Sequence, residues 1–293
     1  MTDLSEKWKH VSAKPVLAVE EIRRMRGGSQ AHLMRCSDGH YYVVKFQNNP
    51  QHRRVLVNEL LATRLAACLG LPTTPAVVVE VSEELIRLTH DLVVEMPRQR
   101  IPCLPGLQFG SRLFGNVRIA DNLGCLPYGD LYTTEQLSSF AGMLIFDKWT
   151  CNADGRQVIF SRTASQPGYS MAMIDQGLCF NCGEWNFPDS PRRGLYMDTR
   201  VYAEIKTLDD FEPWLSKLES ELTLDVLFDL AKDIPPEWYA FETESLHSLL
   251  ARLNRRRSTV REQLQTACRV SPHIFPKWID DREPQGNSWS AAA

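Results

Sequence analysis

The sequence predicts an α+β protein with two lobes, a small N-terminal antiparallel sheet that carries one helix and a mainly helical C-terminal lobe. Short runs rich in β-branched and aromatic residues dominate the first 97 residues, and one long apolar helical run interrupts them. Beyond residue 200 the apolar spacing is mostly helical. A length of 293 residues suits one large domain or two lobes. We therefore expect lobes at residues 1–97 and 98–280, and a disordered tail at 281–293.

Composition and charge narrow the class of protein. The formal net charge of −3 does not favour direct binding to nucleic acid. No apolar run is long enough to cross a bilayer, and the N-terminus lacks the apolar core of a signal peptide. These features predict a cytoplasmic protein with no membrane partner. The eight cysteines are scattered, which fits reduced core thiols better than a disulfide framework.

A glycine pair precedes a hairpin in the N-terminal region. Strands are expected at 15–19, 32–36 and 41–46, and the last two are joined by a turn that contains Asp38 and Gly39. Glycine lets backbone N–H groups approach phosphates closely, although a glycine pair is also common in plain turns. The residues of this turn are Gly27, Gly28, Ser29 and Gln30.

A lysine and a glutamate stand out in apolar surroundings. Lys45 lies within the otherwise apolar strand V-V-K-F, and a lysine there is costly unless it is paired or faces a ligand. Glu59 lies on the predicted helix 55–69, which Gly70 ends. The alternatives are a lysine that protects a sheet edge and a solvent-exposed helical acid.

Two further strands are expected at 74–81 and 91–95, which gives the order strand, strand, helix, strand, strand. The following stretch, 98–130, is rich in proline and glycine. We interpret it as a surface connection in preference to a substrate-side loop.

The central feature of the chain is a pair of acids at 154 and 175. A helix expected at 133–150 leads into a polar turn that holds Asp154, and short apolar runs at 158–160 and 171–174 predict a hairpin. Asp175 follows the second run, so each mouth of the hairpin carries an acid. Phosphoryl transfer uses one carboxylate to orient the attacking hydroxyl and another to hold magnesium. Either acid alone is also a common turn residue.

The rest of the chain reads mainly as helices, expected at 202–205, 211–218, 222–232 and 242–268. The basic run at 255–257 is interpreted as a solvated helix face, because the chain is acidic overall. The aromatic residues after Asp175 either shape an acceptor site or pack the interior. They are Phe180, Trp185 and Phe187.

Taken in order, the motifs G-G-S-Q, V-V-K-F, F-D-x-W-x-x-N-x-D and I-D-x-G resemble the HipA-like kinases. The resemblance extends over roughly residues 15–270 and includes I-P-P-E-W-Y at 234–239. It implies a protein-kinase-like fold and an ATP-dependent phosphotransferase that uses Mg²⁺, with a protein serine or threonine as the expected acceptor. Well-known members are toxins paired with a DNA-binding antitoxin, but this sequence does not reveal such a partner.

The resemblance also assigns roles to residues. The glycine turn would cover the phosphates, and Lys45 would contact them with Glu59 as its partner. Asp154 would be the catalytic base and Asp175 the main magnesium ligand. In this fold the segment after the last strand of the small lobe meets adenine, and the residues expected there are Glu95 and Met96.

One departure from the family pattern concerns the metal site. The family commonly shows D-R-H-x-x-N, and this chain has no asparagine five residues after Asp154. Gln157 or Asn152 would have to substitute as a metal ligand, because an amide oxygen can bind magnesium. Arg156 is expected to stabilise phosphate charge or the catalytic loop, or only to cap the turn.

The departure leaves three functions open besides a protein kinase. One is a pseudokinase that binds nucleotide without turnover, and another is a kinase with a small-molecule acceptor. The third is a metal or redox protein built on Cys179 and Cys182. A structural zinc site normally has a second ligand pair at suitable spacing, and none is evident in the sequence.

Overall fold

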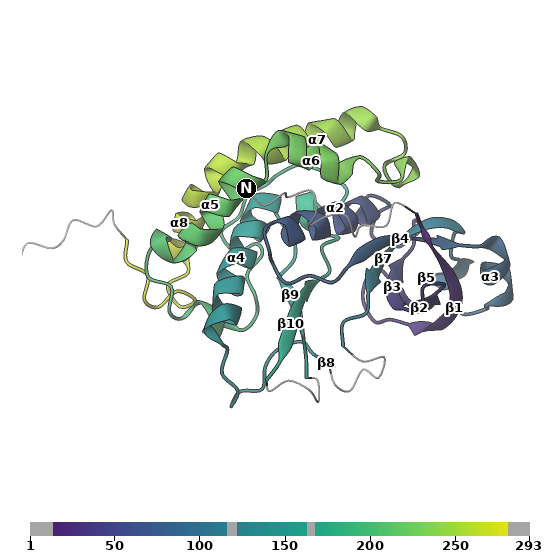
Figure 1. The fold of residues 1–293 in the computed structure, drawn as a ribbon, viewed down its shortest axis with the longest axis horizontal. Coiled ribbons are helices and arrows are strands. Elements are labelled where there is room, and N and C mark those ends of the chain that lie inside the picture. The colour runs from purple at the N-terminus through teal and green to yellow at the C-terminus, as the bar shows by residue number, and fades with distance from the viewer. Residues whose placement is uncertain (1–13, 116–121, 163–167, 281–293) are drawn as a thin grey trace, which may run out of the picture.

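The computed structural model describes residues 14–115, 122–162 and 168–280. Strands and helices are both present, as the α+β prediction requires, and the order of the elements separates a sheet-rich first part from a helix-rich second part (Figure 1). The tail predicted at 281–293 lies outside the described residues.

The N-terminal part is a closed five-stranded barrel in the order β1-β2-β3-β7-β4, in which β1 also pairs in parallel with β4. Its interior is apolar and includes Met34, Val44 and Val79, all fully buried. Between the strands run α2, α3 and the hairpin of β5 and β6. The elements are β1 (Val16–Arg24), β2 (His32–Cys36), β3 (Tyr41–Lys45), α2 (Val55–Cys68), β4 (Ala76–Val81), α3 (Glu83–Leu88), β5 (Val93–Met96), β6 (Gln99–Pro102) and β7 (Gly106–Arg112).

The prediction of a plain connection at 98–130 is wrong, because this stretch contains β6 and β7. Strand β7 lies between β3 and β4, and Gly110 pairs with both Val44 and Val77. A Cβ atom on Gly110 would lie 2.5 Å from a methyl carbon of Val79, so a glycine is needed for this packing. A boundary at residue 97 would remove β7 from its sheet. We therefore propose that the N-terminal lobe extends to Arg112.

The second part contains a three-stranded sheet and most of the helices. Helix α4 begins as predicted at Thr133, whose hydroxyl accepts from the Gln136 N–H while the Gln136 side chain accepts from the Thr133 N–H. The single helix predicted at 242–268 is two helices joined by a 3₁₀ turn, and that predicted at 202–205 is a 3₁₀ turn at 199–202. The elements are β8 (Asn122–Leu123), α4 (Thr134–Thr150), β9 (Gln157–Ser161), β10 (Ser170–Ile174), η2 (Cys179–Asn181), η3 (Thr199–Tyr202), η4 (Leu208–Phe211), α5 (Glu212–Glu221), α6 (Leu224–Ala231), η5 (Pro236–Tyr239), α7 (Thr243–Arg256), η6 (Arg257–Thr259) and α8 (Val260–Val270).

Helix α2 lies between the barrel and the helices α6 and α7 (Figure 1). It is buried on nearly all sides, and even its arginine is paired: Arg64 Nη1 donates to Asp233 Oδ1 at 2.6 Å and to the Leu230 carbonyl at 2.7 Å. The indole Nε1 of buried Trp238 donates to the carbonyl of Leu107 in β7 at 2.8 Å. These bonds connect the barrel, α2 and the C-terminal helices.

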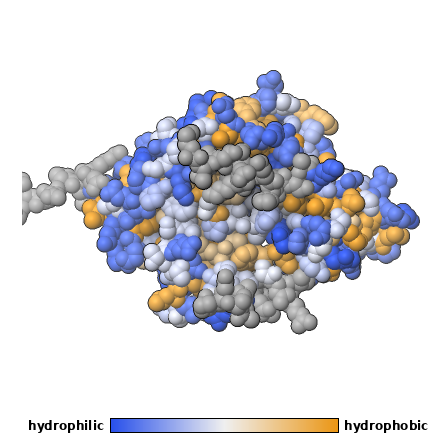
Figure 2. All heavy atoms as spheres, viewed as in Figure 1, coloured by the Kyte–Doolittle hydropathy of each residue, from blue (hydrophilic) through white to orange (hydrophobic). Residues whose placement is uncertain are grey.

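Surface hydropathy differs between the two ends of the molecule. Figure 2 shows apolar residues gathered at the right-hand end, where Figure 1 places the barrel and α3. Exposed apolar side chains there include Leu17, Leu88 and Leu104. Within the described part of the chain, no helix combines the length and apolar character needed to cross a membrane.

Candidate functional site

A cavity of about 250 Å³ lies between the barrel and the β9–β10 hairpin. The barrel contributes the turn after β1, the end of β3 and the end of β7, and the second part contributes β9 and the end of β10. Basic, acidic and apolar side chains all line it. They are Arg23, Met25, Arg26, Gly27, Ser29, Ala31, Val43, Lys45, Glu59, Phe109, Ser111, Arg112, Leu113, Phe114, Gln157, Ile159, Ile174 and Asp175.

Lys45, Glu59 and Asp175 meet in this cavity although they lie far apart in the sequence. Lys45 Nζ forms an ion pair with Glu59 and donates to Asp175 Oδ1 at 2.7 Å. Lys45 and Glu59 are buried, whereas Asp175 is partly exposed to the cavity. Neither alternative reading, a sheet-edge lysine or a solvent-exposed acid, describes these side chains.

Burial and charge act against each other in this group. Burial disfavours the Lys45 ammonium, but the two carboxylates outweigh it and raise the pKa of Lys45 above its ordinary value. Burial also acts to raise the pKa of Asp175, but the Lys45 ammonium holds that pKa below its usual range. For Glu59 burial prevails, and its pKa is raised despite Lys45. Of the two acids that contact Lys45, Asp175 therefore stays ionised more readily than Glu59.

A glycine makes room for this group. Glu59 Oε2 accepts from the Gln176 N–H at 3.0 Å, and a Cβ atom on Gly177 would lie 2.9 Å from Glu59 Oε1 and 2.7 Å from Val55 Cγ1. In the I-D-Q-G motif, Asp175 thus stands two residues before Gly177, the glycine that makes room for Glu59 beside Asp175.

Asp154 and Asp175 lie at the same mouth of the β9–β10 hairpin, in which Gln157 pairs with Ile174. Asp154 is exposed and lies in the short turn that leads into β9. The Gln157 amide nitrogen is 3.2 Å from Asp154 Oδ2 and 3.3 Å from Asp175 Oδ2. The predicted hairpin is confirmed, but the two acids lie at one end of it and not one at each mouth, with the side chain of Gln157 between them.

Asp147 is a site residue that the sequence analysis missed. Its buried carboxylate forms an ion pair with Arg156, whose Nε donates to Asp147 Oδ2 at 2.9 Å and whose Nη1 donates to the Ile174 carbonyl. Asn152 Nδ2 also donates to Asp147, and Asn152 Oδ1 accepts from the Asp154 N–H at 3.2 Å. The sequence signal that could have identified Asp147 is the presence of an acid inside the apolar helical run F-D-K-W.

This network corrects two predictions. Arg156 is buried against Asp147 and does not line the cavity, so it supports the turn and does not face phosphate. Asn152 uses both ends of its amide inside the protein, so it is not placed as a metal ligand. Of the two amides predicted as substitutes, only Gln157 lies beside the acids.

The glycine turn contributes only part of what was predicted. Gly27 and Ser29 line the cavity, and Gly27 has a φ of +131°, a backbone conformation that favours glycine. Gly28 instead lies against Gln51, where a Cβ atom would come within 3.2 Å of the amide nitrogen. The Gln30 side chain exchanges two hydrogen bonds with the backbone of Glu95, at 2.8 and 2.7 Å.

The predicted adenine-binding residues, Glu95 and Met96, are misplaced for that role. They end β5, and the Glu95 backbone groups are taken by Gln30. The chain leaves the barrel after β7 instead, and Arg112, Leu113 and Phe114 line the cavity. The prediction failed because it missed β7. It therefore took the strand predicted at 91–95 as the last one before the chain leaves the barrel.

Nothing in the described ranges adds further ligands to the C-x-x-C pair. Burial raises the pKa of the Cys179 thiol to about 12 and also raises that of Cys182, so both stay protonated near neutral pH. In the described ranges, no three His, Cys, Asp or Glu side chains are grouped to hold a metal ion. All eight cysteines are free thiols.

Comparisons with solved structures show what the fold is similar to. The proinflammatory kinase CtkA of Helicobacter pylori aligns with a TM-score of 0.56 at 14% identity, over 87% of this chain and 98% of CtkA. Hydra Fam20 aligns with a TM-score of 0.50 at 12% identity, over 96% and 94%. A chain of the Shewanella oneidensis HipA, HipB and operator DNA complex gives 0.41 at 13% identity, over 84% and 68%.

Sequence comparisons give the family. Comparison with curated proteins gives no match. The family described as HipA-like kinase matches residues 18–269, which is most of the chain. This span contains the lysine strand, the buried glutamate helix and the two-acid hairpin. The chain therefore belongs to the HipA-like kinase family.

Proposed function

We propose that the chain is an active ATP-dependent kinase that transfers the γ-phosphoryl group to a hydroxyl, with a protein serine or threonine as the acceptor. In this proposal the barrel and α2 form one lobe, the remaining helices form the other, and ATP binds between them. The observation that carries it is the convergence of Lys45, Glu59 and Asp175 beside Asp154. Both acids lie at one mouth of the hairpin, as in-line transfer between a nucleotide and an acceptor requires.

The cavity lining fits ATP chemically. Val43, Ile159 and Ile174 offer apolar surface for a planar base, and the backbone after β7 offers hydrogen-bonding groups. Lys45 and the turn at Gly27 would hold the phosphates, because a buried ammonium and close backbone N–H groups both favour anions.

The donor set also fits Mg²⁺, which prefers oxygen ligands and is often held by one or two carboxylates together with substrate phosphates. Asp175 would be the main ligand, since Lys45 keeps its pKa low. The Gln157 amide nitrogen donates to both acids, and with the amide turned over Gln157 would add an oxygen ligand. When bound, the metal would neutralise charge on the phosphates. Asp154 is exposed beside this group and would orient the acceptor hydroxyl and take its proton.

The test is phosphotransfer from labelled ATP by purified protein with magnesium, using a mixed protein lysate as acceptor source. We expect Asp154→Asn to lower transfer by about 10²- to 10⁴-fold with unchanged ATP affinity, because only a proton acceptor is lost. Asp175→Asn should lose magnesium-dependent ATP binding itself. Asp91→Asn removes an exposed acid that is distant in sequence from Asp154 and Asp175, and it should behave as the parent protein.

The outcomes separate the proposal from its alternatives. ATP binding without transfer to protein or to small metabolites would identify a pseudokinase. Transfer only to a small molecule in a lysate filtrate would identify a small-molecule kinase. Transfer that survives Asp154→Asn would remove this residue from the proposed role. An antitoxin-like partner forms no part of the proposal.

A further inference from the structure

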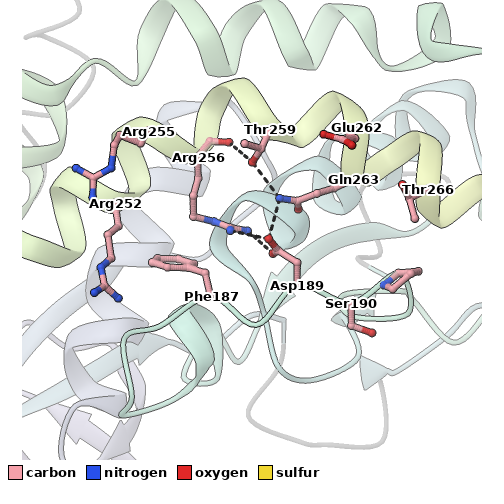
Figure 3. Close-up of a pocket in the computed structure, with 11 residues that line it drawn as sticks. Phe187, Asp189, Ser190, Arg252, Arg255, Arg256, Thr259, Glu262, Gln263 and Thr266 are labelled. Carbon is pink, nitrogen blue, oxygen red and sulfur yellow. Dashed lines mark hydrogen bonds and ion pairs between the residues drawn. The ribbon is translucent and has the colours of Figure 1, made fainter.

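A second, larger depression of about 550 Å³ lies on the helical part, between α7, α8 and the segment 187–191 (Figure 3). We call it the arginine groove. It is open to solvent along two helices and holds no residue of the nucleotide cavity. Its lining residues are Phe187, Asp189, Ser190, Pro191, Arg252, Arg255, Arg256, Thr259, Glu262, Gln263 and Thr266.

The floor of the groove is attached to the end of α4. Arg256 donates to the carbonyls of Lys148 and Trp149, both at 2.9 Å, forms an ion pair with Asp189 at 2.6 Å and lies 4.4 Å from the Phe187 ring. The prediction that residues 255–257 form a solvated basic face is therefore wrong for Arg256, whose side chain is largely buried.

The same segment continues directly to the acid pair. Lys148 Nζ donates to the carbonyls of Pro191 and Arg193, both at 2.7 Å. One residue later the Gly194 N–H donates to the Asp154 carbonyl at 3.2 Å. A ligand in the groove would thus contact the segment that ends at the backbone of Asp154.

Two arginines in the groove remain available for an anion. Asp189 is taken by Arg256 and by the Gln263 amide. Arg252 makes one hydrogen bond, to the Trp185 carbonyl at 3.2 Å, and the Arg255 side chain has no polar partner within the described ranges. Figure 3 shows both at one end of the groove, with Glu262 toward the other. Guanidinium groups bind carboxylates through paired hydrogen bonds.

We propose that the arginine groove binds an acidic segment of the acceptor protein, with carboxylates on Arg252 and Arg255 and apolar contact on Phe187. This rests on the proposed kinase function and specifies its substrate as a protein with acidic residues. A nucleic acid suits the groove less well, because it carries a phosphate at every nucleotide and Asp189 and Glu262 line the groove beyond Arg252 and Arg255, whereas a protein segment can place its carboxylates at the arginine end alone. An open groove along two helices also suits an extended chain better than a small molecule.

The test measures binding first, without ATP or magnesium, so that it does not depend on turnover. The probe is a fluorescein-labelled peptide of alternating glutamate and glycine around a central serine, and its glutamine counterpart is the reference. We expect Arg252→Gln/Arg255→Gln to weaken binding of the glutamate peptide about tenfold or more, by loss of charged hydrogen bonds. The matched control is Arg87→Gln/Arg100→Gln on the barrel, which changes net charge equally at exposed sites and should leave binding within about twofold.

Equal weakening in both double variants would reduce the effect to net charge and overturn the proposal. So would the absence of binding, or tighter Arg252- and Arg255-dependent binding of a single-stranded oligonucleotide. Labelling of the glutamate peptide in preference to the glutamine peptide, lost in Arg252→Gln/Arg255→Gln, would support it. Asp154→Asn should bind the peptide as the parent protein does, because Asp154 does not line the groove. In the parent protein, peptide binding without any labelling would sink the kinase function and not the groove.

Discussion

At the residue scale, Gln157 gives the sharpest test of the metal site. It is exposed and lies within 3.3 Å of both acids, so Gln157→Leu should fold normally and still lose an oxygen ligand. We expect the magnesium concentration for half-maximal phosphotransfer to rise about tenfold or more. Gln157→Glu restores an oxygen at this position and should recover most of the loss. Equal magnesium dependence in all three proteins would exclude Gln157 as a ligand.

Gly177 tests how tightly the buried charges are packed. A methyl group there would meet Glu59 and Val55 below 3 Å, so Gly177→Ala should cost about 1–3 kcal/mol in the free energy of unfolding. It should also weaken ATP binding, because Glu59 must move. Gly129→Ala, which has open space around its Cβ position, should change stability by less than about 0.5 kcal/mol. Urea denaturation of both variants makes the comparison, and equal stability would contradict it.

The sequence was informative about individual residues where chemistry conflicted with surroundings. A lysine in an apolar strand and two acids after apolar runs predicted Lys45, Asp154 and Asp175, which the fold brings to one place. Asp147 was equally anomalous inside the apolar helix α4, but Arg156 was expected on phosphate, the catalytic loop or the turn, and its pairing with Asp147 was missed. Sequence alone does not say which of several nearby charges will pair.

At the scale of elements, Lys148 controls the segment 189–193. Burial lowers its pKa from an ordinary value near 10.5 to about 8, although its ammonium donates to carbonyls of Ser190, Pro191 and Arg193. Above pH 8 it becomes an amine with two N–H groups for three acceptors. Because burial disfavours the ammonium, opening that exposes Lys148 to water becomes less favourable once the proton is lost, and we expect hydrogen-exchange protection factors in this segment to rise between pH 7 and 9.

The global stability changes in the same direction. The folded protein releases this proton near pH 8 and the unfolded chain near 10.5, so this group makes the free energy of unfolding rise with pH across that window. Lys148→Arg stays charged and should abolish the change in local protection. Protection that rises equally in the parent and in Lys148→Arg would assign the change to another group.

Elements with strong local patterns were predicted, and those that depend on distant partners were not. The capped helix α4 and the β9–β10 hairpin follow from periodicity and turn residues. Strand β7 carries two glycines in its seven residues, and its two neighbours come from earlier in the chain. Because its pairing is non-local, the exit from the barrel and the residues lining it were misplaced.

At the scale of the whole molecule, Trp238 connects the C-terminal helices to the barrel. Trp238→Phe keeps the buried ring but removes the donor to the Leu107 carbonyl, which should cost about 1 kcal/mol. Trp278 is the matched control, since its indole nitrogen is buried with no hydrogen-bond partner within the described part of the chain. Trp278→Phe should be neutral or stabilising. Urea denaturation gives both values, and a larger loss in Trp278→Phe would contradict this account.

The position of β7 also has a consequence for biosynthesis. Of the five barrel strands it is made last, yet it fills the gap between β3 and β4. While the ribosome adds α3, β5 and β6, the nascent barrel therefore has two unpaired strand edges, which are sites for association with other chains. Closure becomes possible only once Arg112 has emerged. We therefore expect the nascent chain to be prone to association with other chains while the residues from Val81 to Arg112 are being added.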